Sequence, residues 1–318
     1  MVSAVSTLDT RHPSPPYRGR FAPSPTGPLH FGSLVAATGS YLEARVHHGR
    51  WFVRIDDLDP PRVVHGSADQ ILATLETCGM EWDAPVVYQS TRSEAYHCAL
   101  HALRQHGKIY ACACSRREIA DSGLAGPEGF VYPGTCRTGL PSGRPARAWR
   151  VETRGSVIAF DDAIQGRIEQ DLGVSIGDFV LYRADRVYAY HLAVAVDDAE
   201  QGISDVVRGA DLLDSTPRQI LLQRLLGLPT PRYAHLPVAL NARGEKLSKQ
   251  TYAAPVDTAH ASAALVGALR FLGHDAPAGL TRAAVRDVWQ WALANWRLER
   301  VPRVRAINTT MHSGSGQA

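Results

Sequence analysis

Arg18–Ser33 reads RGRFAPSPTGPLHFGS, and this stretch changes its local structure twice. Its first five residues predict a short β-strand. The proline- and glycine-rich part that follows cannot continue the strand, because proline removes a ladder donor and glycine favours a turn. From Leu29 the apolar spacing becomes helical and ends at Gly49. His30 and Gly32 therefore lie at a strand–loop–helix junction, where backbone N–H groups favour an anion and a glycine lets a nucleotide approach closely.

A second motif, KLSKQ, lies far downstream at Lys246–Gln250. The chain has only three lysines among 34 basic residues, and two of them, Lys246 and Lys249, occur here. Lysine offers a point charge on a mobile stem, which suits a polyphosphate that moves during a reaction. Taken singly, the motifs have plainer explanations, a solvated loop for KLSKQ and a cap or packing residue for His30. Taken together, they favour a phosphate site.

The order of the two motifs resembles the signature motifs of class I aminoacyl-tRNA synthetases, written HIGH and KMSKS. The wording of the first is similar to the glutamyl and glutaminyl branch of that family. Further matches follow in the family's order: RIDDLD at 54–59, YHLA at 190–193 and VVRGADLL at 206–213. The resemblance covers residues 18–250 and implies an α/β fold, a Rossmann-type catalytic domain with a parallel sheet. The chain departs from the family at Asp56, where Glu is usual, at Ser33, where many members have His, and at Gln250, where the motif ends in Ser.

The resemblance implies that the chain activates glutamate with ATP. The expected catalytic residues are His30, Gly32, Lys246 and Lys249. Three of these, His30, Gly32 and Lys249, are expected to bind ATP, with Mg²⁺ held mainly by phosphate oxygens and water.

Glutamate carries two carboxylates and one ammonium, so a selective site needs two arginine forks and an acid. The positions that match the family's glutamate site are Arg20, Phe21, Ala22, Pro23, Ser24, Asp56, Tyr190 and Arg208. Which arginine binds which carboxylate stays open. The plainer alternatives are a surface salt bridge for each charge and a packed strand position for Tyr190.

Three cysteines and a tyrosine flank a stretch rich in glycine and proline, in the pattern Cys112-x-Cys114 followed by Tyr132-x-x-x-Cys136. Zinc takes four ligands in a tetrahedron and can order a segment that has no core of its own. From the residues alone, buried packing thiols are an equal alternative. The resemblance implies one structural Zn²⁺, because this pattern is a zinc site in the glutamyl-Q subfamily. Cys78 and Cys98 are expected to be ordinary core thiols.

Composition excludes few functions. The 318 residues are 45% hydrophobic and 20% charged, with a net charge of +3 that permits a nucleic-acid partner without requiring one. No apolar run reaches the length of a membrane span, so we expect no membrane role. The N-terminus lacks an apolar signal core, and the five cysteines are odd in number, so a reducing, cytoplasmic location is expected.

The expected organisation has six segments. Residues 18–107 and 151–250 form the two halves of the catalytic domain, the second ending in the KLSKQ loop. Residues 108–150 form the zinc-binding insertion between them. A helical extension follows at 251–297. The ends, residues 1–17 and 298–318, are expected to be disordered.

Finer predictions follow from local patterns. Ser115 is expected to cap a helix. Val187–Val196, rich in β-branched and aromatic residues, is expected to be a strand. Helices are expected at Ala259–Leu272 and Arg282–Trp296.

The short extent of the chain after Gln250 leaves little room for an anticodon-binding region. The resemblance therefore implies a glutamyl-Q tRNA(Asp) synthetase, which activates glutamate without tRNA and esterifies it to queuosine at the wobble position of tRNA(Asp). Its expected partners are ATP, L-glutamate and that tRNA, and the chain is expected to be a monomer. Two alternatives stay open: a reduced glutamyl-tRNA synthetase that charges the 3′ end, and a catalytically silent, synthetase-like binding protein.

Overall fold

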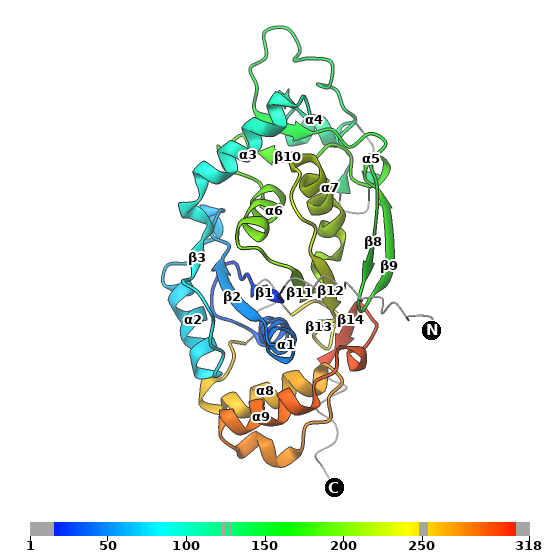
Figure 1. Cartoon of the computed structure of the whole chain (residues 1–318). Coiled ribbons are helices and arrows are strands. Elements are labelled where there is room, and N and C mark those ends of the chain that lie inside the picture. Colours follow the sequence, from blue (N-terminus) through cyan, green and yellow to red (C-terminus); the bar gives the residue numbers. More distant parts are fainter. Residues whose placement is uncertain (1–15, 123–124, 127–128, 248–253, 310–318) are drawn as a thin grey trace, which may run out of the picture.

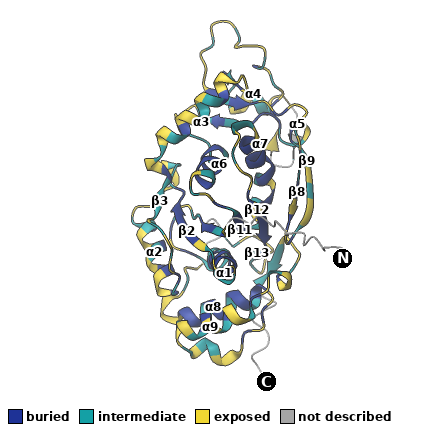
Figure 2. Ribbon diagram, viewed as in Figure 1, coloured by how far each residue is buried: buried dark blue, intermediate teal, exposed yellow. Residues whose placement is uncertain are grey.

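The computed structural model describes residues 16–122, 125–126, 129–247 and 254–309. The molecule is elongated, with α4 (Arg116–Ala120), which follows Cys112 and Cys114 in the sequence, near one end and helices α8 (Ala261–Phe271) and α9 (Val285–Asn295) at the other (Figure 1). Both helices confirm the expectation from the sequence. Buried apolar side chains form two large clusters, one joining α1 (Phe31–Val46) to the first strands and to α8 and α9, the other around α6 (Tyr190–Glu200) and α7 (Thr216–Leu226) (Figure 2).

The first sheet is parallel, in the order β1–β2–β3, with strands at Arg18–Phe21, Arg50–Ile55 and Val87–Tyr88. Helix α1 (Phe31–Val46) connects β1 to β2, and α2 (Ser67–Thr77) lies between β2 and β3. Parallel neighbours need such crossovers, which supply the helices that cover the sheet. The predicted α/β architecture with parallel strands is confirmed.

The second sheet has the order β11–β12–β8–β9, with strands at Asp205–Gly209, Arg232–Leu236, Val157–Asp162 and Gly166–Asp171. Helix α7 (Thr216–Leu226) connects the parallel pair β11 and β12. β11 packs beside β1, and the backbone N–H of Ser204, just before β11, donates to the carbonyl of Arg18 (3.0 Å) at the start of β1. The carboxyl ends of β1 and β11 therefore lie side by side.

One predicted strand is wrong. Residues 187–196 were expected to be extended, but α6 runs from Tyr190 to Glu200. The run Leu192–Val196 is buried on every side, and a short apolar run that is buried all round has no periodicity to distinguish a helix from a strand. This difference matters for the site, because the helix continues into two buried acids, Asp197 and Asp198.

The cysteine-bearing end follows α3 (Ser93–Gln105) and contains an antiparallel sheet, β10–β7–β4, with strands at Val180–Tyr182, Ala148–Val151 and Ile109–Cys112. Smaller elements there are α4 (Arg116–Ala120), β5 (Ala125–Gly126), β6 (Gly129–Phe130) and α5 (Leu172–Ser175). Ser115 caps α4 in a reciprocal pair with Glu118, which confirms its predicted role. Cys78 is buried as expected, whereas Cys98 is exposed on α3, so its prediction as a core thiol is wrong.

Part of the expected disordered tail is ordered. Residues 298–309 are described, and β14 (Ala306–Asn308) pairs in parallel with β13 (Val238–Leu240). Val301 is only 2% exposed. The segment is held by backbone pairing to a strand that precedes it by more than sixty residues, and its basic, polar composition does not reveal such a partner.

Candidate active site

One cavity of about 630 Å³ opens where the carboxyl ends of β1 and β11 meet the start of α1. It is lined by segments far apart in the sequence: the loop after β1, the first turns of α1, Tyr190, residues 207–212, residues 236–239 and residues 246–247. In open α/β sheets, ligands bind outside the carboxyl ends of the strands. The fold therefore places this cavity where a substrate site is expected.

The two sequence motifs reach the same cavity. His30, Gly32 and Lys246 all line it. A Cβ atom added to Gly32 would lie 3.7 Å from the carbonyl oxygen of Leu247 and 3.2 Å from the His30 ring. The His30 ring caps α1, since its Nδ1 accepts from the backbone N–H of Ser33 (3.3 Å). Because Gly32 has no side chain, the cavity keeps its space between the His30 ring and the backbone at Leu247.

The described lysine of KLSKQ lies at the rim. The Nζ of Lys246 donates to the carboxylate of Asp211, which also lines the cavity. The side chain of Lys246 is about half exposed, so its ammonium sits between the cavity and solvent. The other lysine of the motif, Lys249, lies outside the described residues.

Arg208, at the end of β11, forms one wall of the cavity and is held by neutral groups. Its Nη2 donates to Thr216 Oγ1 (2.7 Å), to Gln219 Oε1 (2.9 Å) and to the Leu212 carbonyl (3.3 Å). Its Nε donates to His235 Nε2 (3.0 Å).

The acceptor of that Nε hydrogen bond is a neutral imidazole. His235 has its Nδ1 2.6 Å from a carboxylate oxygen of Asp162. Burial lowers the pKa of His235 to about 4, so the ring is neutral at pH 7 and its Nε2 can accept. The remaining nitrogen of Arg208, Nη1, is buried and has no hydrogen-bond partner among the described residues. A buried guanidinium with an unpartnered nitrogen is a receptor for an anion.

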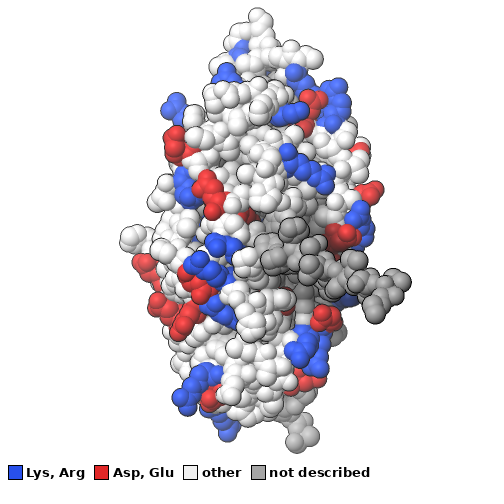
Figure 3. Space-filling view, in the orientation of Figure 1, with Lys and Arg blue, Asp and Glu red and all other residues white. Residues whose placement is uncertain are grey.

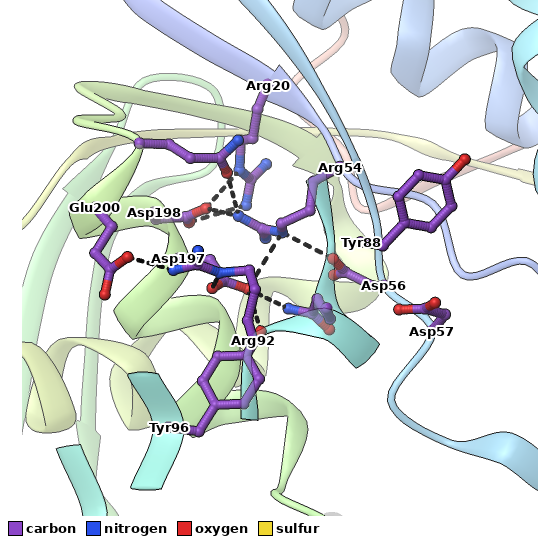
Figure 4. A network of polar contacts seen from close by, with 12 residues as sticks. Arg20, Arg54, Asp56, Asp57, Tyr88, Arg92, Tyr96, Asp197, Asp198 and Glu200 are labelled. Carbon is purple, nitrogen blue, oxygen red and sulfur yellow. Dashed lines mark hydrogen bonds and ion pairs between the residues drawn. The ribbon is translucent and has the colours of Figure 1, made fainter. Parts of the chain in front are cut away.

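A second wall of the cavity carries Arg20, on the neighbouring strand β1, and this arginine is held by charged groups. Its Nε and Nη2 donate to the two oxygens of Asp198 on α6 (3.2 and 3.3 Å), and Arg54 on β2 donates to Asp198 Oδ1 (2.7 Å), as Figure 4 shows. Arg54 also donates to Asp56 (2.8 Å). Burial lowers the pKa of Arg54, but the carboxylates of Asp56, Asp198 and Asp197 more than offset it and hold that pKa well above its usual range.

This ionic cluster extends away from the cavity. Asp197 accepts from Arg92 Nε (2.6 Å), Gln89 Nε2 (2.7 Å) and Tyr96 Oη (2.8 Å). Three arginines, at 20, 54 and 92, therefore face three buried aspartates, at 56, 197 and 198, with Glu200 at the exposed edge (Figure 4). Without the exposed Glu200, the three arginines balance the three aspartates, which is the condition under which buried ions are tolerated.

Asp56 stands behind the cavity rather than on its surface. It is not among the residues that line the cavity, and its carboxylate accepts from Arg54. Its backbone N–H donates to the carbonyl of Pro23 (3.0 Å), so it supports the loop that does line the cavity. Burial raises the pKa of Asp56 to about 6.

The other positions predicted for the glutamate site line the cavity: Phe21, Ala22, Pro23, Ser24 and Tyr190. Tyr190 is the first residue of α6, not a strand residue.

The four predicted metal ligands meet at the other end of the molecule. The Sγ atoms of Cys112, Cys114 and Cys136 lie within 4.8 Å of one another, with Cys114 and Cys136 3.7 Å apart. Tyr132 Oη lies 3.4 Å from Cys112 Sγ and 3.6 Å from Cys114 Sγ. Bonds of about 2.3 Å to sulfur and about 2.0 Å to oxygen put tetrahedral zinc ligands about 3.5–3.8 Å apart. The side chains present therefore fit a zinc site.

Several groups that shape the cavity were missed in the sequence: Arg54, Asp162, Asp198, Asp211, Gln219 and His235. Arg54 and Asp211 fall inside stretches that match the family, but only their neighbours were singled out. A usable signal existed for Asp198. Two adjacent acids directly follow a five-residue apolar run. If the run and the acids are taken as one helix, the acids continue its buried part and need buried partners.

The surface is mixed in charge. On the face drawn in Figure 3, basic and acidic side chains are interspersed rather than gathered by sign. Among the described residues, no helix combines the length and the apolar character that a bilayer crossing requires.

Comparison with known proteins assigns the class. A family profile described as "tRNA synthetases class I (E and Q), catalytic domain" matches residues 17–125 and 143–273. The chain is therefore a class I aminoacyl-tRNA synthetase by its catalytic domain. It is 59% identical over 290 residues to the glutamyl-Q tRNA(Asp) synthetase of Aromatoleum aromaticum, covering 91% of this chain and 92% of that one. It is 61% identical over 294 residues to the protein of that name from Dechloromonas aromatica, covering 92% and 98%. The chain belongs to the glutamyl-Q tRNA(Asp) synthetase family.

A solved structure supports the fold. The glutamate tRNA ligase of Elizabethkingia meningosepticum, crystallised in complex with its amino acid, superposes with a TM-score of 0.74 at 25% identity. The superposition covers 92% of this chain and 67% of that one.

Proposed function

We propose that this chain activates L-glutamate with ATP in the absence of tRNA, and then transfers the glutamyl group to the queuosine base at the wobble position of tRNA(Asp). The observation that carries the proposal is Arg208, whose buried Nη1 lacks a partner among the described residues in the cavity that also holds His30 and Gly32. The names of the relatives at 59% and 61% identity support the choice of substrates.

In the first step, an oxygen of the glutamate α-carboxylate attacks the α-phosphorus of ATP. The new bond joins that oxygen to phosphorus, and the bond from phosphorus to the bridging oxygen breaks, so that pyrophosphate leaves with the electron pair. Negative charge spreads over the phosphoryl oxygens, and fixed positive groups lower the barrier. In the second step, a queuosine hydroxyl attacks the acyl carbon, which releases AMP and a proton.

The residues around the α1 junction are proposed to bind ATP. The His30 ring contacts the α-phosphate, and Gly32 leaves room for the nucleotide. Lys246 exchanges its contact with Asp211 for the β- and γ-phosphates, and Lys249 acts beside it. Mg²⁺ bound to the triphosphate partly neutralises its charge and is held mainly by substrate oxygens and water.

Glutamate is proposed to lie between the two arginine walls. Arg208 takes one carboxylate through its unpartnered Nη1, and Arg20 takes the other from its fixed position on Asp198. The phenol of Tyr190 and the buried Asp56 hold the ammonium end, and Phe21, Ala22, Pro23 and Ser24 close the pocket. Because aspartate is one methylene shorter than glutamate, a water is expected between Asp56 and the ammonium.

The cysteine cluster is proposed to hold one structural Zn²⁺ through Cys112, Cys114, Tyr132 and Cys136. The ion ties α4 and the chain around Tyr132 to the antiparallel sheet. Metal analysis of the purified chain should give one zinc per molecule and much less for Cys114→Ser, while Cys98→Ser, an exposed thiol outside the cluster, keeps the metal. A metal-free wild-type chain that folds normally would remove the zinc from the proposal.

Glutamate-dependent exchange of pyrophosphate into ATP, run with and without tRNA, tests the first step. We expect exchange without tRNA. Absence of exchange in the folded chain would favour the catalytically silent alternative.

The second step is tested by digesting tRNA charged with labelled glutamate. Label on the queuosine nucleoside supports the proposal, and label on the 3′ adenosine would identify a glutamyl-tRNA synthetase instead. Size measurement in solution tests the proposed monomer.

A further inference from the structure

A second cleft, of about 430 Å³, lies at the cysteine-bearing end of the molecule. Its walls come from α4, from Gly129–Tyr132, from β7, from Ser175–Val180 and from α7. The first cavity and this cleft lie on two sides of the start of α6. Tyr190 lines the first cavity, and the ring of the next residue, His191, packs edge-on against Phe179, which lines the second (5.7 Å between ring centroids).

The second cleft is rich in positive charge. Three arginines line it: Arg116, which is exposed on α4, and Arg150 and Arg218, each 8% exposed. Arg150 donates through Nη1 to the carbonyl of Asp178 (2.7 Å), but its buried Nε has no hydrogen-bond partner among the described residues. An arginine that is nine-tenths buried with an unpartnered nitrogen has room for one more acceptor.

The carboxylate in this cleft does not cancel that charge. Asp178 is the acidic residue among the described lining residues, and its carboxylate is already occupied. It accepts from Arg137 Nε (2.6 Å) and Nη2 (2.9 Å), from the Thr153 backbone N–H (2.9 Å) and hydroxyl (3.0 Å), and from Tyr110. Arg137 is therefore its counter-ion, and among the described residues the Asp178 carboxylate forms no ion pair with Arg116 or Arg150.

Aromatic surface accompanies the charge. The guanidinium of Arg150 lies 4.1 Å above the ring centroid of Tyr132, and the Phe130 side chain is 57% exposed at the cleft. Tyr132 also belongs to the cysteine cluster, so the predicted metal site fixes one wall. A combination of arginine and aromatic faces is the common way to bind an unpaired RNA base together with its phosphate.

We propose that this second cleft binds an unpaired nucleotide of the RNA that lies next to the nucleotide being glutamylated. Its base stacks on the exposed ring of Phe130, and its phosphate contacts Arg116 and Arg150, which Tyr132 holds in place. This inference rests on the proposed function, which requires that a nucleotide enter the first cavity while its neighbours remain outside. The two sites approach each other at the start of α6, through Tyr190 and His191, which suits consecutive nucleotides of one loop.

Two substitutions at exposed positions test the cleft without disturbing the core: Arg116→Gln and Phe130→Ala. The matched control is Arg117→Gln, the adjacent residue of α4, which is exposed, is not among the lining residues and removes the same charge. We expect the KM for queuosine-containing tRNA(Asp) to rise about five- to tenfold for the charge change and about tenfold or more for the loss of stacking. Pyrophosphate exchange should stay at the wild-type value in all three variants.

Direct binding separates this inference from the proposed function. The RNA probe is an anticodon stem–loop of about 17 nucleotides. Its affinity should fall in Arg116→Gln and Phe130→Ala but not in Arg117→Gln. This result is expected even if the transfer reaction itself proved different. Equal affinity in all variants, or an equal loss in both arginine variants, would overturn the cleft as an RNA site. Displacement of the stem–loop by micromolar uridine monophosphate would also overturn it, because the cleft would then bind a free nucleotide.

Discussion

The two arginines of the first cavity are held in opposite ways. Arg20 donates to Asp198 and belongs to a buried cluster in which arginines and aspartates balance. Arg208 donates to neutral acceptors throughout, including the neutral imidazole of His235, and forms no ion pair with a described carboxylate. One wall is therefore electrically complete before substrate arrives, and the other is not.

This difference in charge compensation implies that the two walls contribute differently to glutamate binding. A buried cation without a counter-ion is costly, so the fold gains most when an anion binds beside Arg208. Arg20 gains less from the same anion, because Asp198 already neutralises it. We therefore expect Arg208 to supply most of the affinity for glutamate, and the Arg20 wall to supply rigidity and selectivity.

Substitution of Arg208 should have the largest effect. Arg208→Gln removes the uncompensated charge, and we expect glutamate-dependent exchange to fall about a thousandfold, equivalent to about 4 kcal/mol. Arg224→Gln, which changes an exposed arginine on α7, the helix that follows β11, should change exchange less than twofold. Steady-state exchange over a range of glutamate concentrations measures both. A near-normal KM for glutamate in a folded Arg208→Gln chain would show that Arg208 does not supply most of the affinity.

Asp198→Asn should instead reduce stability. It leaves Arg20 and Arg54 facing one carboxylate fewer in a buried cluster, so we expect the free energy of unfolding to fall by about 3 kcal/mol. Asp161→Asn is the control, since its ion pair with Arg167 is well exposed and is worth less than about 1 kcal/mol. Urea denaturation gives both values. A stability loss no larger than that of the control would mean that the cluster is not a structural frame.

The sequence predicts the arginine of each wall but not the groups that hold it. Both arginines were found because they fall in stretches that match the family, and the proline- and glycine-rich loop after β1 predicted the junction that holds His30. Their partners were not found. Asp198 follows a run that was read as a strand, and His235 lies in no recognised stretch.

The same limit explains the errors in the fold. Strand β14 depends on pairing with β13, and α6 depends on burial from all sides. Partners supplied by tertiary structure leave no local pattern. The parallel sheet was predictable because its crossovers are punctuated locally by glycine and proline.

The pH dependence of glutamate binding should come from the Arg20 wall. Asp56 has a pKa raised to about 6, whereas His235, with a pKa lowered to about 4, stays neutral between pH 5 and 7. If the Asp56 carboxylate holds the ammonium, its protonation on acidification raises the KM for glutamate about tenfold between pH 7 and pH 5. Asp56→Asn should give a higher KM that is flat over the same range.

Acidification should have the opposite effect on the contribution of Asp56 to folding stability. A carboxyl whose pKa is raised on folding binds its proton more tightly in the folded chain, so Asp56 favours folding as the pH falls from 6 towards 4. Protonation of Asp56 is therefore expected to raise the KM without itself destabilising the folded chain. A KM profile shared by the wild type and Asp56→Asn would place the titrating group elsewhere.

The smallest effect is expected from His235→Gln, which tests how the Arg208 wall is oriented. Glutamine keeps an acceptor for the Nε of Arg208, and the Nη2 bonds to Thr216, Gln219 and the Leu212 carbonyl remain. Only one of four contacts is weakened, so we expect the KM for glutamate to rise about threefold, under 1 kcal/mol, with kcat unchanged. Kinetics at saturating ATP separate the two constants. A loss as large as that of Arg208→Gln would mean that the imidazole, together with Asp162, supplies the charge balance of this wall, and the contrast between the walls would then disappear.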